Sequence, residues 1–280
     1  MSKKYPITIS SWSLGDQCGF EERVRAAKNA GFEGIGLRAE TYVDALNQGL
    51  SDSDILNILN KYNMSVTEVE YIVQWADESR SYEQKYKEQI CFHMCGLFNV
   101  QHINCGLMEH YSIEHTARKL KELCHRAGDL IIGVEPMPYS GIPDIKRAWD
   151  IVKACGCENA GLILDSWHWI RANTPIDLHM LDEIPANKII SVQINDVHQR
   201  PYAAPVLRDE SMHDRLAPGT GYGNTAGFCQ MLKEKGVLPR ALGVEVISDS
   251  NLSMGIDDAA SYLYNEAKKV LETSWPQLLQ

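Results

Sequence analysis

Apolar residues follow two alternating patterns along this chain, and the alternation recurs about every 30 residues, the length of a strand–helix unit. Short runs such as 131–134, 162–164 and 244–247 are apolar on both faces, which is typical of parallel strands covered by helices. Strands are predicted at 7–12, 34–38, 66–71, 102–106, 130–135, 161–165, 188–195 and 241–247. Longer segments with helical spacing predict helices at 20–30, 51–62, 82–98, 113–127, 145–154, 178–184, 226–235 and 257–271.

Eight strand–helix units in succession favour a (β/α)8 TIM barrel, an α/β fold, formed as a single domain by residues 1–280. No Pro/Ser-rich linker or low-complexity stretch interrupts the chain. The alternative is an open doubly wound sheet, which often has a Gly-rich turn after its first strand. No such turn is visible here, so we expect the barrel.

Charge and hydropathy argue against some classes of binding partner. The net charge of −10 argues against nucleic acid, because a phosphate backbone favours a basic surface. No apolar run approaches the roughly 18–20 residues of a membrane span. The first residues include two lysines without an apolar signal core behind them, so we expect a cytoplasmic protein.

The chain has eight cysteines, which we expect to be reduced and mostly buried. Cys155 and Cys157, one residue apart, raise the alternative of a metal site. No second pair of Cys or His stands at zinc-knuckle spacing, and we therefore favour the reduced thiols.

Polar residues gather where the predicted strands end, which in a TIM barrel is the mouth that holds the active site. On the last four strands these residues are Glu135, Asp165, Gln193 and Glu245. Carboxylates crowded at one mouth repel one another unless a cation lies among them or some take up protons. An oxygen-only set favours one divalent ion, Mn²⁺ first and Mg²⁺ or Co²⁺ as alternatives, over Zn²⁺, which prefers His and Cys. Any one of these residues alone is more typical of a solvated loop or an ion pair, and the case for a metal site rests on the four together on adjacent strands.

Several motifs, in this order and spacing, resemble those of the xylose isomerase-like TIM-barrel superfamily. This superfamily groups sugar phosphate isomerases and epimerases, inosose-processing enzymes, 3-dehydroshikimate dehydratases and endonuclease IV. The resemblance covers most of the chain. Its motifs are GIGL at 34–37, GVEP at 133–136, GLILDSWH at 161–168, VQIND at 192–196, HDR at 213–215 before PGTG at 218–221, and GVEV at 243–246.

The resemblance implies roles for individual residues. Glu135, Asp165 and Glu245 match the metal-binding carboxylates, and Gln193 stands where many members have a His ligand. Some members similar to 3-dehydroshikimate dehydratases have Gln at that position. His168 matches a substrate-contacting His three residues after the metal-binding Asp.

Residues that would contact the substrate are also predicted. Arg215 matches an Arg that reaches substrate oxygens. Trp12 would wall the pocket, as would Trp75 and Trp169, although core packing explains these tryptophans equally well. Glu70 lies on the third predicted strand, and Arg38, Arg200 and Arg215 would pair with a carboxylate substrate.

A metal that chelates a ketone oxygen and a neighbouring hydroxyl acidifies the adjacent C–H and stabilises an enediolate. The resemblance implies that Glu135 and Glu245 shuttle the proton while His168 holds or protonates a substrate oxygen. We therefore expect a metal-dependent isomerase or epimerase acting on a ketose or cyclic keto-polyol, a small polyhydroxylated carbonyl compound. The alternative is a hydro-lyase that dehydrates inosose or a dehydroshikimate-like acid. A barrel without catalysis and a DNA-repair enzyme are less favoured, and a homodimer or homotetramer is common for such barrels.

Overall fold

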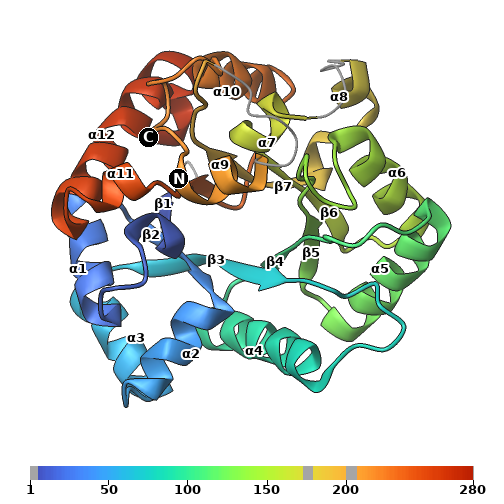
Figure 1. The fold of residues 1–280 in the computed structure, drawn as a ribbon, viewed down its shortest axis with the longest axis horizontal. Coiled ribbons are helices and arrows are strands. Elements are labelled where there is room, and N and C mark those ends of the chain that lie inside the picture. Colours follow the sequence, from blue (N-terminus) through green and yellow to red (C-terminus); the bar gives the residue numbers. More distant parts are fainter. Residues whose placement is uncertain (1–5, 173–178, 200–206, 280) are drawn as a thin grey trace.

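The computed structural model describes residues 6–172, 179–199 and 207–279. Its strands form a closed parallel barrel in chain order, in which the first strand also pairs with the last. The strands are β1 (Ile7–Ser10), β2 (Gly34–Arg38), β3 (Ser65–Ile72), β4 (His102–Cys105), β5 (Ile131–Val134), β6 (Ala160–Asp165), β7 (Ile189–Ile194) and β8 (Leu242–Val244). The predicted TIM barrel is confirmed, and Figure 1 shows its strands inside a ring of helices.

Eight helices occur where the spacing predicted them, most within two residues of the predicted ends. They are α1 (Phe20–Ala30), α3 (Asp52–Lys61), α4 (Tyr82–Phe98), α5 (Ile113–Ala127), α6 (Ile145–Cys155), α8 (His179–Glu183), α10 (Thr225–Glu234) and α12 (Ile256–Ser274). Four further helices were not predicted: α2 (Ala39–Asn47), α7 (Ser166–Ile170), α9 (Leu207–His213) and α11 (Asp249–Leu252). In Figure 1, α7 and α9 lie inside the ring formed by the larger helices.

Local sequence signals explain where the helices begin and end. Ser51 caps α3: its hydroxyl accepts from the Asp54 amide, and the Asp54 carboxylate accepts from the Ser51 amide. Gly31 ends α1 in the left-handed conformation at φ 114°, which glycine adopts without steric cost. The first strand is shorter than predicted because residues 11–14 form a 3₁₀ turn, and this turn places Trp12 at the mouth.

The barrel interior is polar below the mouth. Glu68 on β3 is fully buried and accepts hydrogen bonds from Asn104 (2.9 Å) and Ser191 (2.5 Å). Gly243 leaves room for its carboxylate, since a Cβ there would lie 3.3 Å from Oε2, closer than an ordinary contact. This polar layer supports the residues at the strand ends above it.

Among the described residues, none of the helices combines the length and the apolar composition that crossing a bilayer requires.

Candidate metal and substrate site

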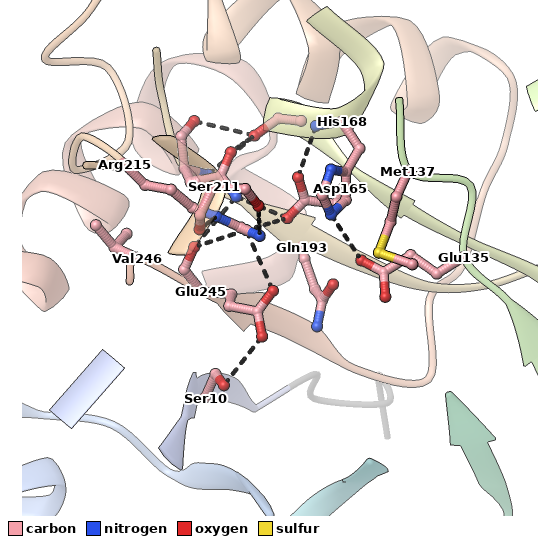
Figure 2. A network of polar contacts seen from close by, with 12 residues as sticks. Ser10, Glu135, Met137, Asp165, His168, Gln193, Ser211, Arg215, Glu245 and Val246 are labelled. Carbon is pink, nitrogen blue, oxygen red and sulfur yellow. Dashed lines mark hydrogen bonds and ion pairs between the residues drawn. The ribbon is translucent and has the colours of Figure 1, made fainter. Parts of the chain in front are cut away.

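Three carboxylates converge at the mouth of the barrel. Glu135 directly follows β5, Asp165 is the last residue of β6, and Glu245 directly follows β8. One oxygen from each lies within 4.8 Å of the others, and all three side chains are buried. The closed barrel thus brings these three residues, from strands far apart in the sequence, into one cluster (Figure 2).

Gln193 completes the cluster from β7, where it stands in register with Asp165 on β6. Its Nε2 donates to Glu70 Oε1 at 2.8 Å and lies 3.5 Å from Glu68 Oε2. An amide nitrogen suits a place beside two carboxyl groups better than an amide oxygen does, so these contacts assign Oε1 to the other side. Oε1 is buried and has no hydrogen-bond partner among the described residues. In Figure 2 the Gln193 side chain lies between Glu135 and Glu245.

Arg215 supplies the positive charge that the chain itself brings to this site. Its Nη1 lies 3.1 Å from Asp165 Oδ2 and 3.2 Å from Glu245 Oε2. The rest of the guanidinium is held by Ser211, through the backbone oxygen at 2.7 Å and the hydroxyl at 2.8 Å. Arg215 thus pairs with two of the three carboxylates, and its single positive charge does not balance three negative ones.

The pKa values of the carboxyl groups reflect this imbalance. Burial, with repulsion from Glu245 and Asp165, raises the pKa of Glu135 well above its usual range. Burial likewise raises the pKa of Asp165 to about 6, although the charge of Arg215 opposes the shift. The carboxyl groups of Glu135 and Asp165 are therefore stabilised either by a bound cation or by taking up a proton.

His168 lies beside the carboxylates because Asp165 caps the short helix that carries it. The Asp165 Oδ1 accepts from the His168 amide at 2.9 Å, and the imidazole Nε2 lies 3.4 Å from Glu135 Oε1. Burial, and secondarily the charge of Arg215, lower the pKa of His168 well below its ordinary value. The imidazole is therefore neutral at pH 7, and its buried Nδ1 has no partner among the described residues.

A cavity of about 150 Å³ opens beside the cluster. Trp12, Arg38 and Glu70, predicted as substrate-binding residues, all line it. The guanidinium of Arg38 lies over the Trp12 ring, 3.5 Å from the centroid. Sequence reasoning missed further lining residues, namely Tyr71, Met108, Met137, Tyr139, Arg208 and Met212.

Some predicted residues lie elsewhere. Trp75 is fully buried and donates to the Gly106 carbonyl at 2.9 Å, and Trp169 packs against Phe228, so both belong to the core packing. Glu40, the second residue of α2, pairs with Lys87 and lies 3.7 Å from Arg38 Nε, so it contacts a cavity residue without lining the cavity. Arg200 lies outside the described residues.

The Gly-rich loop at 218–223 folds onto a side chain of the protein. The Asp196 carboxylate accepts from the amides of Gly221 (3.1 Å) and Gly223 (2.7 Å). A Cβ at Gly221 would lie 2.3 Å from the Val197 carbonyl oxygen, which explains the glycine there. These amides are already bonded within the chain, so they are not available to bind a phosphate group.

A model of the xylose isomerase-like TIM barrel matches residues 24–268 of this sequence. The chain belongs to this family. One curated relative, the 3-dehydroshikimate dehydratase of Pseudomonas aeruginosa, is 31% identical over 160 residues, which cover 54% of this chain and 24% of the relative. The inosose isomerase of Halalkalibacterium halodurans is 30% identical over 122 residues, covering 44% of this chain and 40% of that protein. The chain thus aligns with less than half the length of these two relatives.

Solved structures share the fold of this family member. The IolI protein, solved with a bound zinc atom, superposes with a TM-score of 0.82 over 96% of this chain and 99% of its own. Its sequence identity to this chain is 16%, so the similarity concerns the fold.

Proposed function

We propose that this family member is a divalent-metal-dependent isomerase or epimerase acting on a ketose or cyclic keto-polyol. The observation that carries the proposal is the buried set of three carboxylates together with the unpartnered Oε1 of Gln193. A buried amide oxygen without a partner costs free energy unless something binds it. A cation among these four residues satisfies that oxygen and offsets the excess negative charge.

The four residues fit the predicted ion. Glu135, Asp165, Gln193 and Glu245 offer only oxygen atoms, the ligand type that Mn²⁺, Mg²⁺ and Co²⁺ share. We propose Mn²⁺ as the working ion. Bound there, the ion would polarise the carbonyl of the substrate and acidify the neighbouring C–H.

The roles of the chain's own residues follow from their placement. Glu135 and Glu245 approach the centre of the cluster from opposite sides of Gln193 in Figure 2. One of them removes a proton from the carbon next to the carbonyl, and the other returns a proton at the adjacent carbon or the opposite face. His168, neutral and buried beside Glu135, holds or protonates a substrate oxygen.

The cavity supports a small polyhydroxylated carbonyl compound as the substrate. Trp12 offers a flat face, stiffened by the guanidinium of Arg38, on which the apolar face of a sugar or cyclitol ring packs. Glu70 Oε2 is buried without a partner among the described residues and would accept from a substrate hydroxyl. The inosose isomerase relative supports this substrate class.

A second candidate is dehydration, in which a β-hydroxyl leaves after the same proton abstraction. It is favoured by three arginines that line the cavity, Arg38, Arg208 and Arg215, because such a lining suits an anionic substrate. The similarity to a 3-dehydroshikimate dehydratase supports this alternative.

The test is incubation of the Mn²⁺-loaded protein in D₂O with a panel of ketoses, inososes and dehydroshikimate-like acids. Deuterium in recovered substrate or in an isomer supports the isomerase, whereas a new ultraviolet-absorbing enone or aromatic product supports the dehydratase. Glu245→Gln should lose the reaction, and the control Glu234→Gln, at the exposed end of α10 away from the mouth, should keep it. Absence of exchange and of product with every compound would contradict both reactions.

A further inference from the structure

Three cysteines gather at the end of the barrel opposite the mouth. Cys124 lies in the last turn of α5, Cys155 is the last residue of α6, and Cys157 precedes β6. Their sulfur atoms all lie within 4.8 Å of one another, and all three thiols are free. Cys124 and Cys155 are buried, and Cys157 is partly exposed. The sequence showed only Cys155 and Cys157, because their third member comes from the preceding helix.

The backbone around this thiol trio, Cys124, Cys155 and Cys157, is firmly held. Gly156, in the left-handed conformation at φ 68°, ends α6 and turns the chain so that both neighbouring cysteines face the same place. Asn159 Nδ2 lies 3.0 Å from each of three backbone oxygens in the α5–β5 region, including that of Cys124. Lys188 Nζ lies 2.9 Å from the oxygen of Glu158 and 3.4 Å from that of Cys157. The backbone positions of the three cysteines are therefore determined by the fold.

The geometry suits a metal ion. With metal–sulfur bonds of about 2.3 Å, three sulfurs of a tetrahedral site lie about 3.8 Å apart. The trio is within 4.8 Å already, so side-chain rotations that move the sulfurs by about 1 Å or less would close the site. The thiolate is the form that binds metal. Binding of the ion would therefore release the thiol protons.

We propose that Cys124, Cys155 and Cys157 form a trithiolate site for one thiophilic metal ion of the Zn²⁺ type, separate from the cluster at the mouth. Sulfur donors favour thiophilic ions such as Zn²⁺, whereas the oxygen donors at the mouth suit harder ions such as Mn²⁺ and Mg²⁺. The two ends of the barrel therefore differ in the ions that they favour. The partly exposed Cys157 side is where the ion would enter and where a solvent molecule completes its coordination. Bound there, the ion links the ends of α5 and α6, which pack side by side (Figure 1).

The test is titration of the reduced, metal-free protein with Co²⁺, a coloured stand-in for Zn²⁺, followed by ultraviolet–visible absorption. A thiolate-to-cobalt charge-transfer band should grow until one equivalent is bound to the trio. The oxygen ligands at the mouth give no such band, so Glu245→Gln should leave it unchanged whether or not the proposed function holds. Cys155→Ser should abolish the band, and Cys229→Ser, which changes a buried thiol of α10, should keep it.

Three results would overturn the proposal: no band in the wild type, a band of full intensity in Cys155→Ser, or a disulfide within the trio in freshly purified protein. If Cys155→Ser does not fold, Cys157→Ser replaces it, since this side chain is partly exposed. In the Glu245→Gln background, in which the mouth site is weakened, Zn²⁺ should raise the melting temperature, and adding Cys157→Ser should remove most of that rise. An equal rise with and without Cys157→Ser would exclude the trio as the site.

Discussion

Gln193→Leu tests whether the amide oxygen of Gln193 is a metal ligand. Leucine keeps the approximate volume but removes Oε1 and also removes the Nε2 donor that lies 2.8 Å from Glu70. Burial, with repulsion from Glu245 and Glu68, raises the pKa of Glu70 well above its usual range, so in the metal-free protein this bond is made to a neutral carboxyl group and contributes about 0.5–1.5 kcal/mol. Glu70 retains the donor Asn104 at 2.9 Å, and leucine also removes the buried oxygen that has no partner, so we expect metal-free stability to change by about 1 kcal/mol or less.

The effect on metal binding should be larger. Loss of an outer partner of a metal ligand typically weakens binding by about 10–100-fold, so loss of a ligand itself should cost about 100-fold or more. At a metal concentration about 100 times the wild-type Kd, binding stabilises the wild type by about 2.7 kcal/mol. A variant with about 100-fold weaker binding gains only about 0.4 kcal/mol under the same conditions.

The assay is urea unfolding with and without Mn²⁺ for the wild type, Gln193→Leu and Gln193→His. Histidine offers both a ring nitrogen for the metal and an N–H for Glu70, so Gln193→His should keep most of the metal-dependent gain. Gln101→Leu, an exposed glutamine outside the site, is the control. If Gln193→Leu gained as much stability from Mn²⁺ as the wild type, the amide oxygen would not be a ligand.

Three further outcomes are expected. Glu245→Gln should bind Mn²⁺ more weakly by calorimetry and reduce turnover about 100-fold or more, as loss of a proton-transfer group does; unchanged values would remove Glu245 from the site. Mn²⁺ affinity should fall as the pH drops through about 6, because burial raises the pKa of Asp165 to about 6 and a protonated carboxyl is a poor ligand; a flat pH profile would contradict this. Gly141→Ala should destabilise the protein by about 3 kcal/mol or more in urea, since its Cβ would lie 1.8 Å from the Glu109 carbonyl oxygen. The matched change Gly96→Ala, in α4 with nothing within 4 Å, should leave stability unchanged or increase it.

The barrel could be predicted because the long helices repeat their apolar spacing over several turns and the buried strands are short continuous apolar runs. The short helices α7 and α11, of five and four residues, contain little more than one turn and show no such repeat. The missed α2 follows β2 directly, so its first residues, including Glu40, read as the loop of a strand end.

The residues of the candidate site could likewise be predicted only in part from the sequence. Glu135, Asp165 and Glu245 could be placed together because carboxyl ends of parallel strands share one rim of a barrel. Tyr139 and Arg208 could not, because they reach the cavity from segments outside the strands. The thiol trio was missed for the related reason that Cys124 meets Cys155 only through the packing of α5 against α6.

The most direct test of the central claim is an anomalous difference map from a crystal of this protein soaked in Mn²⁺. The structure predicts a single strong peak at the mouth, in contact with Glu135, Asp165 and Glu245 and with the Oε1 atom of Gln193. A peak elsewhere, no peak at the mouth, or a Gln193 amide turned so that its nitrogen faces the ion would contradict the four-residue metal site.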